Sequence, residues 1–191
     1  MDKAKFALLL VVFVDVLGQG LILPIINSLL IDPASGFLPK DTPTATRELY
    51  YGIVIGSFFL AWFLGAAYIS KLSDMIGRKT GIQICLFGAL IGYLLTIVSL
   101  YTDSLWLLIL GRVITGFTAG NQPIAQAAMI DLSRDEADKA RNMGFIVASF
   151  SLSLVVGPLM AGLLSDTALL GGLASLQLPF YVATGMVAIV I

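Results

Sequence analysis

The stretch SDMIGRKTG, residues 73–81, separates two long apolar segments. It places one acid and two bases around a glycine, in a chain of 191 residues of which only 12% are charged. Soluble domains carry roughly 25% charged residues. With 58% hydrophobic residues and a mean hydropathy of +0.97, the composition predicts a polytopic helical membrane protein, and this stretch is then a turn outside the bilayer.

Apolar segments long enough to cross a membrane, about 20 residues each, recur along the chain. We expect transmembrane helices at residues 6–30, 49–69, 80–100, 105–129 and 143–165, and a further one that begins near residue 178 and is still apolar at residue 191. Residues 1–191 are therefore expected to form one N-terminal transmembrane bundle that ends inside its sixth helix. The first apolar segment is too long for a signal peptide, so we expect it to be retained.

Lysine and arginine are distributed unevenly between the two sides of the predicted membrane. One side receives eight of these residues, which are Lys3, Lys5, Lys71, Arg78, Lys79, Arg134, Lys139 and Arg141. The other side receives only two, Lys40 and Arg47. Because cytoplasmic loops are enriched in positive charge, the bias predicts a cytoplasmic N-terminus and a cytoplasmic turn at residues 73–81.

Two charged residues lie inside predicted spans, Asp15 in the first and Arg112 in the fourth. Each costs a few kcal/mol by insertion scales, so such residues usually face a bundle interior or a water-filled cavity. Gln19 lies one turn from Asp15, and Gln126 continues a helical stripe that starts at Arg112. These residues indicate a functional site, although a buried ion pair that only holds helices together is an alternative.

The first and fourth spans share a pattern, since each combines a charge, two glycines and a proline in DVLGQGLILP (15–24) and RVITGFTAGNQP (112–123). A 3+3 inverted repeat would leave this kind of correspondence. In the fifth span, small residues recur every four positions at Ser149, Ser153, Gly157 and Ala161. Such a stripe lets another helix approach closely, and Pro158 favours a kink. Ordinary helix packing would also explain each position taken singly.

Three motifs carry a resemblance to a known family. SKLSDMIGRK, residues 70–79, resembles the signature G-x-x-x-D-x-x-G-R-K between the second and third helices of the major facilitator superfamily. GRVITGFTAG, residues 111–120, resembles the family's fourth-helix motif R-x-x-x-G-x-x-x-G. The fifth span resembles the antiporter motif G-x8-G-x3-G-P-x2-G-G, with Ser153 and Ala161 in place of glycines and matches at Gly144, Gly157, Pro158 and Gly162.

Residues 15–24 also look like the first helix of tetracycline-type drug:proton antiporters. The resemblance implies an all-α fold, the N-terminal six-helix half of a twelve-helix transporter, in a bacterial inner membrane. It also implies alternating access, with a small-molecule substrate and protons as ligands and a C-terminal six-helix half as partner. Asp15 would carry the proton, and Arg112 would favour release of that proton when the two side chains are close. Gln19, Gln122 and Gln126 would line the cavity.

The resemblance gives the cytoplasmic turn a role as a conformational latch. The acid matching Asp74 docks at a helix N-terminus of the C-terminal half, where the helix dipole favours an anion. The base matching Arg78 pairs with an acid at the end of helix four, which is Asp131 here. Gly77 permits the tight turn, and Lys79 completes the motif. A turn that only sets topology is the alternative.

Other functions are disfavoured. The chain has no histidine, and its single cysteine, Cys85, lies in an apolar segment. No nucleotide-binding loop, metal cluster or nucleophile–base set is present, so we expect no enzyme activity, no cofactor, no metal and no nucleic-acid partner. Proton-coupled efflux of small molecules is the favoured function. The alternatives are a proton-coupled importer of the same superfamily and a six-helix half that transports nothing without a partner half.

Overall fold

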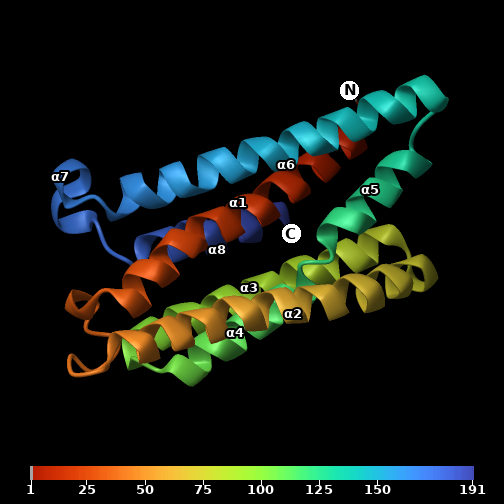
Figure 1. Cartoon of the computed structure of the whole chain (residues 1–191). Helices are drawn as coiled ribbons and strands as arrows, with labels where there is room; N and C mark the ends of the chain where they lie inside the picture. The colour runs from red at the N-terminus through yellow and green to blue at the C-terminus, as the bar shows by residue number, and fades with distance from the viewer. Residues whose placement is uncertain (1) are drawn as a thin grey trace.

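The computed structural model describes residues 2–191, and every regular element among them is a helix (Figure 1). This confirms the all-α prediction. The long helices are α1 (Lys3–Ile31), α2 (Thr44–Ile76), α3 (Arg78–Thr102), α4 (Leu105–Thr118), α5 (Asn121–Asp131), α6 (Glu136–Ser165) and α8 (Leu178–Val190). Short turns of helix are η1 (Pro33–Ser35), α7 (Thr167–Leu170) and η2 (Gly171–Leu173).

Four helices in the described part of the chain, α1, α2, α3 and α6, are long and apolar enough to cross a membrane. Their outer surfaces carry large apolar side chains in the open, including Leu60 and Phe63 on α2 and Val155 on α6. Soluble monomers rarely expose apolar patches of this extent, whereas lipid covers them in a membrane protein.

The segment predicted as one span at residues 105–129 consists of two helices, α4 and α5, which are separated at Ala119 and Gly120. Pro123 explains where the break falls. It has no N–H to donate to the carbonyl of Ala119, four residues earlier, and its ring crowds that carbonyl. Pro24 in α1 and Pro158 in α6, by contrast, lie inside continuous helices.

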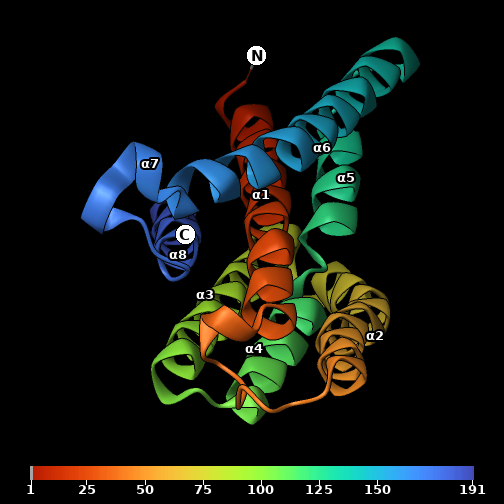
Figure 2. The same cartoon turned by 60° about the vertical axis from the view of Figure 1, so that its left-hand side comes forward.

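The helices form two groups that meet at α1. α1 and α6 run side by side, and α4 packs against both α2 and α3 (Figure 1). α8 lies against α1 and α3, as the turned view shows (Figure 2). Because α1 also contacts α2 and α5, it is surrounded by most of the bundle, which explains why its middle is almost entirely buried.

The small-residue stripe of the fifth predicted span faces α1. Ser149 and Ser153 each donate a hydrogen bond of 2.9 Å to a main-chain carbonyl of α1. One turn further, a Cβ atom on Gly157 would lie 2.8 Å from the Cα atom of Gly20, so nothing larger than hydrogen fits without a shift. Ala161 is fully buried. These contacts place the backbones of α1 and α6 at close range.

A second close approach positions α4. A Cβ atom on Gly116 would overlap the carbonyl of Phe58 in α2, and one on Gly111 would lie 2.8 Å from the carbonyl oxygen of Gly92 in α3. The two glycines thus let α4 fit tightly between its neighbours. This packing carries Arg112, which follows Gly111, into the interior of the bundle.

Candidate functional site

Asp15 lies in the middle of α1 and is only 4% exposed. Asn121, the first residue of α5, faces its carboxyl group. Cys85 and Tyr93 of α3 lie within electrostatic range of the same carboxyl. No ion pair within 4 Å engages Asp15 in the described part of the chain. The acid is therefore held among neutral groups.

Arg112 is equally buried, with 3% of its surface exposed. Its Nη2 atom donates a hydrogen bond of 2.9 Å to Oγ1 of Thr96, and its guanidinium carbon lies 5.8 Å from the centre of the Tyr93 ring. The Nε atom is buried without a hydrogen-bond partner. An arginine over an aromatic face gains a cation–π attraction, which partly offsets its removal from water.

Asp15 and Arg112 form no ion pair in the residues that the structure describes. Tyr93 lies within electrostatic range of both side chains, so it is a neighbour that Asp15 and Arg112 share. A buried acid and a buried base that are not paired with each other form an arrangement whose energy changes if a helix movement alters the distance between them. The geometry gives no support to the alternative in which a direct pair simply holds the helices together.

The three glutamines predicted to line the pathway do not gather at one place. Gln19 borders a small cavity of about 30 Å³ that also touches Arg112 and two aromatic side chains, Phe58 and Phe59. Gln122 and Gln126 are half-buried on α5 and do not line this cavity. The cavity joins polar groups to the faces of aromatic rings.

The turn at residues 73–81 places Arg78 between two carboxylates. Gly77 has φ = 97°, a backbone conformation that residues with a Cβ atom rarely adopt. Arg78 forms an ion pair with Asp74 at the end of α2, and its Nε atom lies 3.4 Å from Oδ2 of Asp131 at the end of α5. Lys79 is exposed and makes no ion pair in the described residues. The turn thus joins α2, α3 and α5.

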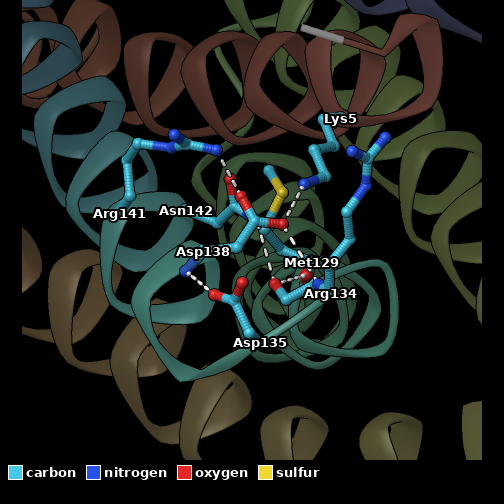
Figure 3. Close-up of polar contacts among 8 residues, drawn as sticks. Lys5, Met129, Arg134, Asp135, Asp138, Arg141 and Asn142 are labelled. Carbon is cyan, nitrogen blue, oxygen red and sulfur yellow. Dashed lines mark hydrogen bonds and ion pairs between the residues drawn. The ribbon is translucent and has the colours of Figure 1, made fainter.

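A second charged cluster joins α1 to α6, and the sequence analysis missed it (Figure 3). Nζ of Lys5 lies 2.8 Å from Oδ2 of Asp138, and both side chains are less than one tenth exposed. The same carboxylate accepts hydrogen bonds from the main-chain N–H of Arg134, at 3.1 Å, and from the guanidinium of Arg141. The side chain of Asp135 caps the helix by accepting from the N–H of Asp138 at 2.7 Å.

These donors stabilise the ionised form of Asp138, a residue that precedes the apolar part of α6. The Lys5 ammonium group, followed by the Arg134 N–H and the Arg141 guanidinium, holds the pKa of the Asp138 carboxyl well below its ordinary value. The pattern of Asp135 followed three residues later by an acid signals a helix start. No local pattern signals the contact with Lys5, because 133 positions separate the two residues.

The residues of the antiporter-type motif differ in what they contact. Ser153 and Gly157 face α1, and the ring of Pro158 lies beside Gly20. At Gly144 and Gly162 an added Cβ atom would meet nothing within 4 Å. The position where serine replaces the motif glycine is thus one of those in closest contact with α1.

An all-helical bundle with apolar outer surfaces, and with a buried acid and a buried base in its interior, fits a multi-pass membrane protein. The sequence profile of the Major Facilitator Superfamily matches residues 6–191, and the chain belongs to this family. The members of this family are transporters and not enzymes.

Curated relatives agree with the family assignment. The chain is 31% identical to a tetracycline resistance protein of class H from Pasteurella multocida, over 87% of this chain and 38% of that protein. It is 32% identical to the class C tetracycline resistance protein of Escherichia coli, over 95% of this chain and 41% of that protein. The chain therefore spans about two fifths of the length of the relatives it matches.

A solved structure supports the fold. The crystal structure of the human organic anion transporter MFSD10 (TETRAN) superposes on the whole of this chain with a TM-score of 0.76 and 23% sequence identity. The chain covers 46% of that protein. At this level of identity the likeness concerns the fold, and it fits one half of a transporter.

Proposed function

We propose that this chain is the N-terminal half of a proton-coupled antiporter that exports small, often lipophilic molecules by alternating access. In this proposal the two halves rock around a site near the middle of the bilayer. The N-terminus lies in the cytoplasm of a bacterial cell, and the bundle is set in the inner membrane. Similarity to proteins named for tetracycline resistance supports efflux as the direction.

The observation that carries the proposal is the burial of Asp15 inside a membrane helix with no ion-pair partner among the described residues. An acid in such a place costs free energy and is kept where it has work to do. It can bind and release a proton as its surroundings change. Arg112, unpaired with Asp15 in this arrangement, would favour proton release if a helix movement brought it closer.

The test uses the whole transporter that contains this chain, reconstituted in vesicles with tetracycline as the probe. We expect Asp15→Asn to reduce proton-driven transport to background, while the folded protein remains in the membrane. Asp103→Asn removes an exposed carboxylate at the end of α3 and serves as the control. Transport by Asp15→Asn at the wild-type rate would remove Asp15 from the mechanism.

The direction of proton movement separates the proposal from the importer alternative. When tetracycline is added outside the vesicles, antiport carries protons out as the drug enters, so the medium should become more acidic. A rise in external pH would indicate symport. If this chain alone moves no protons but does so together with the C-terminal half, it is a half that requires a partner.

We also propose that Asp74, Arg78 and Asp131 form a latch at the cytoplasmic side, with Gly77 setting the turn. The contacts of Arg78 with both acids support this role. In the complete transporter Asp74 would additionally face a helix N-terminus of the other half, where the dipole favours a negative charge. The stripe of α6 from Ser153 to Gly157 would serve as the packing surface on which α1 moves.

A further inference from the structure

Asn121 is a buried polar residue that the proposed function does not use. Its side chain is fully buried, and neither Nδ2 nor Oδ1 has a hydrogen-bond partner. An unsatisfied buried polar group costs free energy, and each native example calls for an explanation. A leucine of similar size would avoid that cost at this position.

The surroundings of Asn121 point to Asp15 as its partner. α5, which begins at Asn121, packs against α1, and the amide lies within interaction range of the Asp15 carboxyl without being hydrogen-bonded to it in this arrangement. The other groups near Asp15 that can ionise are Cys85 and Tyr93 of α3, with Arg112 of α4 beyond the Tyr93 ring. α6 and α8 also pack on α1, but their apolar parts, residues 143–165 and 178–190, contain no charged residue.

An amide suits a carboxyl group that changes its protonation state. Its N–H₂ group donates to an ionised carboxylate, and its carbonyl oxygen accepts from the O–H of a protonated one. A single asparagine therefore serves both states after a flip of its side chain or a small shift of α5. Neither serine nor leucine offers two donors and an acceptor in this geometry.

The break between α4 and α5 gives Asn121 the freedom to respond. Asn121 directly follows Ala119 and Gly120, the two residues that separate α4 from α5. Pro123 causes the break at these residues because it cannot donate a hydrogen bond to the carbonyl of Ala119. α5 then runs as one short helix from Asn121 to Asp131, which contacts Arg78 at the cytoplasmic turn. A change at one end of α5 thus has a continuous path to the other end.

We propose that Asn121 is the positioning residue of the proton site, where its amide holds the Asp15 carboxyl in both protonation states. The inference rests on the proposed function, because it assumes that Asp15 exchanges a proton with water during transport. The proton enters from and returns to the aqueous phase, and Asn121 only orients the carboxyl that carries it.

The test is infrared difference spectroscopy of the whole transporter during a pH titration, which follows the C=O stretch of protonated carboxyl groups. Loss of a band in Asp15→Asn assigns that band to Asp15. In Asn121→Leu we expect the band to move to higher frequency, because the proposed hydrogen bond between the amide and the protonated carboxyl can no longer form. Its titration midpoint should rise by about one pH unit, since a hydrogen bond to a charged group changes an equilibrium about tenfold.

Three further variants keep the test decisive. Asn121→Ala removes the amide without adding bulk and should shift the midpoint in the same direction, whereas Asn121→Ser, which keeps a donor and an acceptor, should move it back toward the wild-type value. Asn27→Leu removes an exposed amide elsewhere on α1 and should change neither band nor midpoint. A band and midpoint in Asn121→Leu and Asn121→Ala equal to those of the wild type would overturn the inference.

The outcome for Asn121 can be separated from that of the proposed function. If Asp15→Asn abolishes transport but the Asn121 variants titrate like the wild type, the proposed function stands and the positioning role is wrong. If Asp15→Asn transports normally, the proposed function is wrong, and with it any role of Asn121 in proton transfer.

Discussion

Lys5 and Asp138 form a buried ion pair, with Nζ 2.8 Å from Oδ2, that ties the start of α1 to the start of α6 (Figure 3). The same two helices meet again deeper in the bundle, where Gly20 and Gly157 nearly touch. α1 and α6 are therefore joined at two levels, by charge at the end and by close packing further along. If one helix moves relative to the other, either the Lys5–Asp138 pair or the Gly20–Gly157 contact must break, or the movement must pivot about one of these two contacts.

Replacing Lys5 with methionine should destabilise the transporter, because Asp138 would remain buried without its buried cationic partner. Lys3→Met removes an exposed lysine two residues away and is the matched control. When the variants are unfolded in denaturing detergent, the free energy of unfolding should be clearly lower for Lys5→Met than for the wild type. It should change little for Lys3→Met. A double-mutant cycle with Asp138→Asn should give a coupling energy well above zero, and additive effects would mean that the pair contributes nothing to stability.

The stabilisation by this pair should disappear in acid. The pKa of Asp138 is lowered in the folded protein, so its contribution is fully present above the unfolded value of about 4 and is lost as the pH falls through the folded value. The stability difference between wild type and Lys5→Met should therefore be constant from about pH 7 to pH 5 and narrow below about pH 4. A difference that widens on acidification would contradict this assignment of charge.

Hydropathy located the helices of this chain but not their ends. α2 extends from Thr44 to Ile76, well beyond the apolar residues 49–69, because polar residues outside the bilayer continue the same helix. The break after Thr118 had a signal in Pro123, yet Pro24 and Pro158 lie in unbroken helices. Which proline interrupts a helix depends on the packing around it, which the sequence does not show.

The charged residues of the proposed site stand out in the sequence because a charge inside an apolar segment is conspicuous. Asp15 and Arg112 were found in this way. Asn121 was missed, because an amide in a membrane helix has no comparable cost and its importance depends on facing Asp15 across the bundle. Arg47 was counted only as a charge outside the membrane, whereas the structure buries it.

Arg47 is expected to hold the loop between α1 and α2 in place. It is 2% exposed and donates to three main-chain carbonyls, those of Leu30, Pro39 and Thr42, at 2.7–3.2 Å. Arg47→Ala would leave these acceptors without a donor and should cost about 3 kcal/mol of unfolding free energy. Lys40→Ala, at an exposed position in the same loop, should cost little. Equal stability of the two variants would show that the loop does not depend on Arg47.

Close packing of α1 on α6 predicts that Gly157 tolerates no side chain. In Gly157→Leu the new atoms would meet the backbone at Gly20, and overpacking of this kind costs about 1–3 kcal/mol or more. We expect transport to be lost or the protein to leak protons, with topology retained. Gly56→Leu, where an added Cβ atom meets nothing within 4 Å, is the control. Unimpaired transport by Gly157→Leu would mean that the two helices separate freely at this level.

The last prediction concerns Asp74, in the turn at residues 73–81, and applies to the whole transporter. In the structure Asp74 is half-exposed and paired with Arg78, and exposed pairs contribute at most about 1 kcal/mol, so Asp74→Asn should scarcely affect the stability of the N-terminal bundle.

Its effect should appear instead in the balance between the inward-open and outward-open states. If Asp74 also faces a helix N-terminus of the C-terminal half, its charge stabilises the closed cytoplasmic side by roughly 0.3–2 kcal/mol. A loss of 1.4 kcal/mol changes a two-state balance about tenfold, so the cytoplasmic side should open more often and transport should fall although Asp15 is untouched.

A cysteine placed at Leu132, beside Asp131, reports on that opening through its rate of labelling from the cytoplasmic side. Asp74→Asn should raise the rate, and Asp131→Asn should raise it as well, because Arg78 then loses one of its two acids. Asp166→Asn, at the opposite end of α6, should leave it unchanged. Equal labelling in all variants, with normal transport, would leave residues 73–81 as a turn that sets topology alone.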